Sequence, residues 1–206
     1  TVNIGCIVSE KVPYSVEIQI EVYQKIARLH WFDRQRVCIL LLMNDRPQLD
    51  IKPVTPDDRV WIDQFYVQRW DSSRVVSRGR LYTVSELPGF IAWKSNTRIG
   101  LLTYHISAAE IEIVTLDSLD PGHGAGTALI SEAINFACDA KSRRLWLITT
   151  NDNMPALHFY QKQGFNLVKI HKDAIKISRE LKPEIPLVGL DGIPIRDEIE
   201  LEYNLT

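Results

Sequence analysis

The chain has 206 residues, enough for one large domain or one domain with an extension. Hydrophobic residues make up 45% and charged residues 24%, which is typical of a folded globular protein and excludes a disordered chain. With 24 Lys and Arg against 26 Asp and Glu, it lacks the basic excess of most nucleic-acid-binding domains. Its apolar runs fall far short of the ~20 residues that span a membrane. We therefore expect a cytoplasmic protein without nucleic-acid or membrane partners.

The first 50 residues carry ambiguous patterns. Tyr14–Trp31 fits a helix or a strand, because its apolar residues occur at both spacings. Val37–Met43 is a continuous apolar run with the length of a buried strand. Three prolines at residues 47–56 indicate a boundary. We predict an N-terminal extension over residues 1–50, with its apolar run ordered and buried on the domain of residues 51–206 or on a second copy of the chain.

From Thr55 onward the sequence alternates between helix and strand patterns. Thr55–Asp58 predicts a helix start, because a capping Thr precedes Pro and two acids face the helix dipole. Ser77–Arg80 is predicted as a loop. The later elements are strands at Gly89–Trp93, Ile99–Ile106 and Ile111–Leu119, a glycine-rich loop at Gly122–Gly126, a helix at Thr127–Ala140, a strand at Leu145–Ile148, a helix at Asn153–Gln163, and strands at Phe165–Ile170 and Ile195–Leu205. This order predicts an α/β (α+β-like) fold around a mixed sheet, antiparallel in its first half.

The glycine-rich loop is the clearest candidate for a binding site. Three glycines in Gly122–Gly126 let backbone N–H groups approach a ligand closely, and the following helix start favours an anion such as phosphate. The loop has no P-loop lysine, and its GxGxG spacing differs from the GxGxxG of dinucleotide-binding folds. A tight turn without a ligand is the alternative.

A second motif follows the buried strand: Asn153-x-x-Ala156-x-x-x-Tyr160-x-x-x-Gly164-Phe165. Together with the strand, GxGxG loop and helix before it, this motif resembles the GNAT superfamily of N-acetyltransferases over roughly Ile51–Leu205. The chain departs from the family at Pro121, where Gln or Arg is usual. The resemblance implies a GNAT-type fold, with a central mixed antiparallel/parallel sheet splayed in the middle and flanked by helices.

The resemblance also implies acetyl-CoA as cosubstrate and no metal. The glycine-rich loop would bind the pyrophosphate, and the strand before it would pair with the pantetheine arm. This requires the sheet to splay between Ile111–Leu119 and Leu145–Ile148. The implied cofactor-binding residues are Leu116, Asp117, Ser118, Gly122, His123, Gly124, Ala125, Gly126, Thr127, Asn153, Ala156 and Tyr160.

The implied reaction transfers acetyl to a primary amine of a small molecule or peptide, by direct attack in a ternary complex. It needs a base, a donor for the oxyanion and an acid for the leaving thiolate. The resemblance assigns the acid to Tyr160, and the backbone N–H of Leu116 is the candidate oxyanion donor. Glu110 and Glu112 are the candidate bases, on one face of a strand because side chains two apart point the same way. His105 or water are the alternatives.

The last strand and two loops complete the expected site. Acidic residues at Glu198, Glu200 and Glu202 share one strand face, which suits a cationic acceptor or protects an edge strand from aggregation. Asp197 lies on the apolar face, where structural pairing is expected. Asp71–Glu86 and Lys172–Pro194 are predicted as loops around the acceptor. A non-catalytic acyl-CoA or CoA sensor and a partner-binding module are the alternative functions, and a homodimer is left open.

Overall fold

The computed structural model describes residues 49–120 and 122–205. The predictions for residues 1–48, including the apolar run Val37–Met43, therefore lie outside the described residues. The segment Thr55–Asp58 illustrates how local sequence determines the start of a helix. Thr55 donates from its backbone N–H and its hydroxyl to the Asp58 carboxylate, at 3.0 and 2.7 Å, ahead of a 3-10 turn and a helix. The predicted helix start is confirmed.

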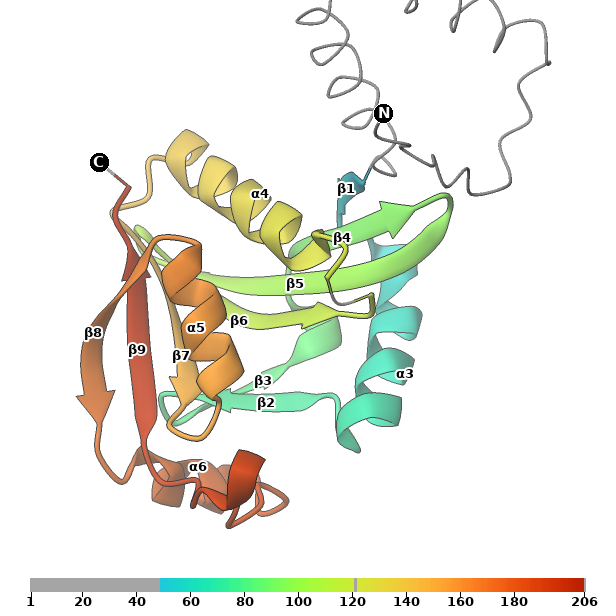
Figure 1. The fold of residues 1–206 in the computed structure, drawn as a ribbon. Helices are drawn as coiled ribbons and strands as arrows, with labels where there is room; N and C mark the ends of the chain where they lie inside the picture. Colours follow the sequence, from blue (N-terminus) through green and yellow to red (C-terminus); the bar gives the residue numbers. More distant parts are fainter. Residues whose placement is uncertain (1–48, 121, 206) are drawn as a thin grey trace, which may run out of the picture. The chain divides into compact units, whose positions relative to one another are not determined.

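A seven-stranded sheet in the order β1-β4-β5-β6-β7-β9-β8 forms the centre of the fold (Figure 1). Only β6 and β7 pair in parallel, and the other neighbours pair antiparallel. The strands are β1 (Asp50–Pro53), β4 (Gly89–Lys94), β5 (Thr97–Ser107), β6 (Glu110–Ser118), β7 (Arg144–Thr150), β8 (Phe165–His171) and β9 (Glu198–Tyr203). The predicted mixed sheet, antiparallel in its first half, is confirmed.

Helices cover both faces of this sheet. On one face, α4 (Ala125–Asp139) and α5 (Met154–Lys162) contribute to the larger apolar core, where Leu129 and Leu157 are buried. On the other face, α3 (Arg59–Trp70) contributes to a second apolar cluster. Short 3-10 turns are η1 (Pro56–Asp58), η2 (Val84–Glu86) and η3 (Leu190–Gly192). The two faces therefore have separate cores, and β6 contributes side chains to both sides.

Two of the segments that were predicted as loops, Asp71–Glu86 and Lys172–Pro194, contain regular structure, whereas the predicted loop Ser77–Arg80 holds the turn of a hairpin. Arg74–Ser77 (β2) and Arg80–Thr83 (β3) form a hairpin, with Arg78 and Gly79 at positive φ of 50° and 69°. Positive φ at both turn residues is the geometry that matches the twist of a two-residue hairpin. Lys172–Pro194 contains a helix, α6 (Ala174–Leu181). The loop predictions were wrong here, because short, mixed-polarity elements give weak periodic signals.

The sheet opens between its two parallel strands. β6 pairs with β7 only from Glu110–Arg144 to Ile113–Leu147. On its other side, β6 has a register shift against β5 between Thr103 and Tyr104, so one extra residue is inserted at the same level. A bulge of this kind bends a strand. Residues 115–118 still pair with β5, but on the side that faces β7 the backbone of residues 114–118 has no strand partner among the described residues. The predicted splay of the sheet is confirmed.

Strand β9 lies inside the sheet, between β7 and β8, and is not an edge strand. Its acidic residues are mostly buried and paired. Glu200 contacts Arg78 at 3.0 Å and His171 at 2.6 Å, and Glu198 accepts from Ser178 at 2.9 Å. Asp197 accepts from the backbone N–H of Asp173 at 2.8 Å and pairs with the neighbouring arginine, which confirms its structural pairing. The acidic row holds elements together, and the explanation as edge protection was wrong.

Candidate functional site

A cleft of about 400 Å³ opens where β6 and β7 separate. Its walls come from residues 114–117 of β6, residues 148–150 of β7, helix α3, strand β2 and residues 182–186. Asn153, at the start of α5, also lines it. The cleft therefore exposes the unpaired β6 edge, and a ligand with an extended polar arm could bind there as an added strand.

The glycine-rich loop follows β6 directly. Gly122 and Gly124 have φ of +87° and +85°, a conformation that favours glycine. A Cβ at Gly122 would have nothing within 4 Å, and at Gly124 it would reach only Leu49 at 4.0 Å. Helix α4 begins at Ala125, and its first N–H groups have no partner within the helix. Open space and outward N–H groups fit a phosphate group.

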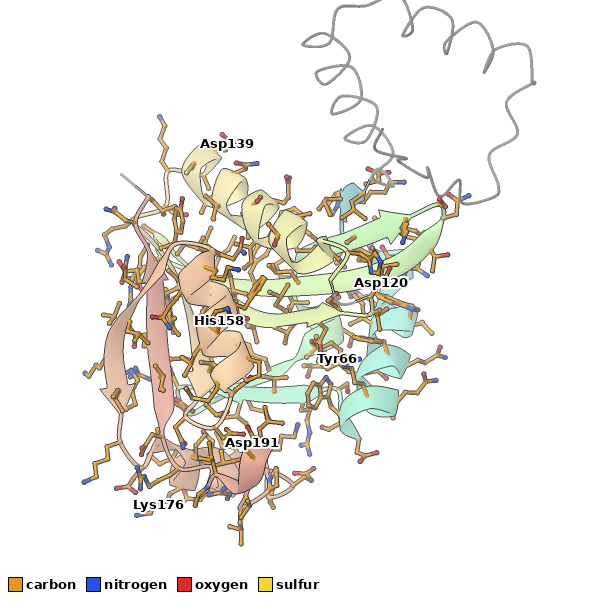
Figure 2. All side chains as sticks on the ribbon, viewed as in Figure 1. Tyr66, Asp120, Asp139, His158, Lys176 and Asp191 are labelled. Atoms are coloured by element: carbon orange, nitrogen blue, oxygen red, sulfur yellow. The ribbon has the colours of Figure 1, made fainter. Side chains whose placement is uncertain are left out.

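The loop entrance carries a neutralised carboxylate. Asp120, labelled in Figure 2, contacts Lys94 at 3.2 Å and His123 at 2.7 Å. This pairing reduces the repulsion between Asp120 and an anion in the loop. His123 belongs to the loop itself and is exposed.

The second motif lies against this loop. A Cβ on Gly126 would come within 3.3 Å of the Phe159 ring, so glycine lets α4 approach α5 closely. Gln163 contacts the Thr127 hydroxyl at 3.4 Å. The Asn153 side chain caps α5 by accepting a hydrogen bond from the backbone N–H of Ala156 at 3.1 Å. Asn153 also lines the cleft. The two motifs identified in the sequence therefore pack against each other, and Asn153 joins the second motif to the cleft.

Tyr160 lies on α5 between the rings of Phe159 and Phe165, with centroids 5.4 and 5.9 Å away. Burial raises the pKa of Tyr160 well above its usual value, and the charge of Asp117 raises it further. The phenol therefore keeps its proton at neutral pH, as a proton donor must.

Asp117 lies near both Tyr160 and Tyr66, and the sequence analysis did not identify Tyr66. Its buried carboxylate accepts a hydrogen bond from Tyr66 of α3, and Arg69 of α3 lies 3.4 Å away. Burial, followed by the charge of Asp117, raises the pKa of Tyr66. No local sequence signal points from Tyr66 to Asp117, because the two residues are 51 positions apart. The carboxylate of Asp117 holds α3 against β6.

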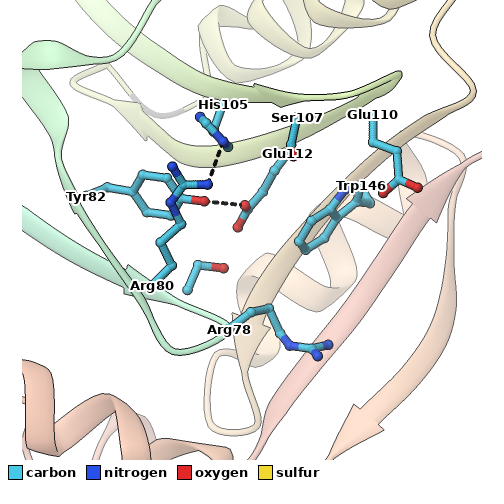
Figure 3. Close-up of a pocket in the computed structure, with 9 residues that line it drawn as sticks. Arg78, Arg80, Tyr82, His105, Ser107, Glu110, Glu112 and Trp146 are labelled. Carbon is cyan, nitrogen blue, oxygen red and sulfur yellow. Dashed lines mark hydrogen bonds between the residues drawn. The ribbon is translucent and has the colours of Figure 1, made fainter.

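A second hollow, which we call the hairpin pocket, lies under the β2–β3 hairpin (Figure 3). Its volume is about 230 Å³. The lining residues are Ser77, Arg78, Arg80, Tyr82, His105, Ser107, Glu110, Glu112 and Trp146. The pocket brings together the three candidate bases, and the prediction that Glu110 and Glu112 share one strand face is confirmed.

The three candidate bases differ in their contacts. Glu110 pairs with Arg143 at 2.5 Å and lies 3.7 Å from Arg144. His105 interacts through Nε2 with Arg80 at 2.7 Å. Burial lowers the pKa of His105, and the positive charge of Arg80 lowers it further, although Glu112 opposes this.

Glu112 is the most deeply placed of the three, with 5% of its surface exposed. Its Oε2 accepts from the Tyr82 hydroxyl at 2.8 Å (Figure 3). Its Oε1 is buried and has no hydrogen-bond partner among the described residues. Buried polar atoms are almost always satisfied, so a free carboxylate oxygen in a pocket is available to a ligand.

The hairpin pocket adjoins the cleft. Glu112 precedes the cleft residue Val114 by two positions on β6, and Trp146 precedes Ile148 by two positions on β7. On β2, Ser77 of the pocket follows Val76 of the cleft. The hairpin pocket and the cleft are thus neighbours along β2, β6 and β7.

The described part of the chain has neither a cluster of metal-binding side chains nor a membrane-spanning helix. Residues 49–120 and 122–205 hold no group of three or more His, Cys, Asp or Glu side chains that could bind a metal ion. No helix within these ranges is both long and apolar enough to cross a membrane.

Comparisons with known proteins agree with this geometry. A model of the acetyltransferase (GNAT) family matches residues 59–165. The uncharacterized protein YxbD of Bacillus subtilis (strain 168) is 36% identical over 76% of this chain and 99% of that relative. The putative phosphinothricin acetyltransferase YwnH, from the same organism, is 32% identical over 56% of this chain and 66% of its own length.

Among solved structures, a GNAT family acetyltransferase from Elizabethkingia anophelis with acetyl-CoA bound has the same fold. It covers 78% of this chain and 99% of its own, with a TM-score of 0.56 and 21% identity. A central mixed sheet flanked by helices is common to both. With a family model over residues 59–165 and a relative aligned over nearly its whole length, the chain belongs to the GNAT family of acetyltransferases.

Proposed function

We propose that this acetyltransferase uses acetyl-CoA and transfers the acetyl group to a primary amine by direct attack in a ternary complex. The observation that carries the proposal is the separation of β6 from β7 beyond the Ile113–Leu147 pair. It leaves the backbone of residues 114–118 open, and the loop Gly122–Gly126 at the start of α4 follows a few residues later with open space at Gly122 and Gly124. The acetyl-CoA-bound relative with the same fold supports this choice of cosubstrate.

Each part of the cosubstrate has a fitting group in this chain. The N–H groups of residues 122–127 would hold the pyrophosphate, and the free edge of β6 would hold the pantetheine arm. Acetyl-CoA supplies an activated thioester. The backbone N–H of Leu116 lies on that edge and would donate to the oxygen on which negative charge develops.

Two side chains would move the protons. Glu112 takes a proton from the bound ammonium through its unpartnered Oε1, and the neutral amine then attacks the thioester carbon. As the C–S bond breaks, Tyr160 gives its proton to the departing sulfur, and the new amide nitrogen loses its second proton to solvent. Glu112 is preferred to Glu110 as the base because arginines already pair with Glu110. The raised pKa of Tyr160 keeps its proton in place until sulfur needs it.

The test combines three measurements on the full chain. Calorimetry with acetyl-CoA should show binding, and a panel of primary amines should cause amine-dependent release of free thiol. Intact mass spectrometry after incubation with acetyl-CoA alone should show an unmodified protein. An acetylated protein would contradict direct attack, because a covalent intermediate would then form. Binding without thiol release for any amine would indicate a sensor, and absence of binding would indicate a partner-binding module.

A further inference from the structure

The hairpin pocket has four charged side chains, and two are already neutralised within the fold. Arg78 contacts Glu200 at 3.0 Å, and Glu110 contacts Arg143 at 2.5 Å. These pairs fix the rim of the pocket. The charges of Glu112 and Arg80 are left to define what the pocket can bind.

In Figure 3, Glu112 contacts the Tyr82 hydroxyl and Arg80 contacts His105. Arg80 lies over the Tyr82 ring at 5.1 Å and contacts His105 at 2.7 Å, and neither partner is a carboxylate. No carboxylate among the described residues lies within ion-pair distance of Arg80. The pocket therefore offers one uncompensated negative group at depth and one uncompensated positive group at its mouth.

A second buried atom strengthens the argument for a ligand. Ser77 is 5% exposed. Its hydroxyl oxygen, Oγ, is buried and has no hydrogen-bond partner among the described residues. Glu112 Oε1, also unpartnered, lines the same pocket. Two unpartnered buried polar atoms in one hollow indicate a polar guest, because folded proteins rarely leave such atoms unsatisfied.

We propose that the hairpin pocket is the acceptor site and that the acceptor is a small zwitterion, such as an α-amino acid. Its ammonium group donates to Glu112 Oε1 and Ser77 Oγ. Its carboxylate, or another small oxyanion, pairs with Arg80, since guanidinium groups bind such anions in a bidentate manner. This inference rests on the proposed function, because it assumes that an amine is the acetyl acceptor.

Size and position agree with this class of acceptor. A volume of about 230 Å³ is below the range of about 300–1,000 Å³ of most ligand pockets, which favours a molecule of amino-acid size over a peptide. Along a strand, two residues span about 7 Å. Glu112, which would bind the amine, is thus separated by about 7 Å along the strand from Val114, where the free edge of β6 begins.

The experiment uses matched amines with the full chain and acetyl-CoA. L-alanine, L-serine and L-aspartate are compared with their carboxamides and with propylamine, and thiol release gives kcat/KM for each. We expect the free acids to exceed the amides and propylamine about tenfold or more. Arg80→Gln should remove this preference by lowering kcat/KM for the acids about tenfold, while the values for amides and the KM for acetyl-CoA change little. Arg59→Gln removes an exposed cation of α3 and is the matched control.

The possible outcomes separate this inference from the proposed function. Acetylation of amines without a preference for acids would overturn the zwitterion proposal and leave the acetyltransferase proposal intact. A preference that survives in Arg80→Gln would overturn the assignment of the anion to Arg80 in the hairpin pocket, because another residue would then bind the anion. If no amine releases thiol, the proposed function fails and the acceptor proposal fails with it.

Discussion

At the scale of single residues, the site depends on groups whose proton state is set by their surroundings. Tyr160 and Tyr66 are both near Asp117, and burial and its charge raise the pKa of each. Glu112 has one satisfied oxygen and one free oxygen, so it can accept a proton without losing its support from Tyr82. These placements support the proposal that Tyr160 acts as the acid and Glu112 as the base.

Replacing Tyr160 with Phe tests the assigned acid. We expect kcat to fall about 10²- to 10⁴-fold with little change in the KM for acetyl-CoA, because the hydroxyl is needed as charge develops on sulfur. Steady-state kinetics from pH 6 to 9 would measure this. Tyr104→Phe is the control, since Tyr104 is buried against Phe90 and Phe136 in the core. An unchanged kcat in Tyr160→Phe would reduce Tyr160 to a packing role.

At the scale of elements, the loop between β6 and α4 owes its shape to glycine. Gly124 caps α4 at a positive φ of 85° with open space around it. Gly126 lets α5 come close to α4. The two glycines therefore differ in their surroundings: Gly124 has open space beside it, and Gly126 keeps two helices in contact.

A valine at Gly124 should abolish cosubstrate binding. At ~100 times its Kd a ligand stabilises a fold by ~2.7 kcal/mol, which a thermal-unfolding scan detects as a rise of several degrees. Gly124→Val should lose the rise caused by acetyl-CoA, because the side chain occupies the anion's space. Gly192→Val is the control, since Gly192 also has a positive φ, of 74°, and no neighbour within 4 Å. A rise of the same size in Gly124→Val would refute the assignment of this loop.

At the scale of the whole molecule, a buried ionic network joins distant parts of the sheet. Glu200 of β9 contacts Arg144 of β7, His171 of β8 and Arg78 of the hairpin turn. Burial raises the pKa of Glu200, but the hydrogen bonds from Arg144 and His171 outweigh burial, so the net pKa lies below the usual 4.5. The β2–β3 hairpin over the hairpin pocket is thus held by a carboxylate.

This network predicts how stability depends on pH. Because the pKa of Glu200 is lower in the folded state, its contribution is complete above about pH 4.5 and is lost as the pH falls through the folded-state value. Glu200→Gln should cost about 1–3 kcal/mol at neutral pH. It should also flatten the loss of stability below that pH, as urea unfolding from pH 3 to 7 would show. Glu184→Gln, in an exposed pair with Arg74, should cost about 0–1 kcal/mol. Equal losses in both variants would contradict the role of the network.

The sequence by itself determined the parts of this protein that depend on neighbouring residues. The helix start at Thr55, the glycine-rich loop and the Asn153-to-Gly164 motif each lie within a dozen residues, so propensity, capping and spacing specify them. The order of these elements, through its resemblance to a family, also predicted the mixed sheet and its splay. Their assignment to acetyl-CoA binding remains a proposal.

Only the tertiary structure decided which side chains share a pocket. Tyr66 and Asp117 are 51 residues apart, and Tyr82 and Glu112 are 30 apart. No local pattern encodes such contacts, because they arise when the hairpin and α3 pack across one face of the sheet. The same applies to β9: its alternating acids suggested an exposed face, but pairing on both sides placed them among arginines and histidine. Burial, and with it the chemistry of Glu112, is a property of the assembled sheet.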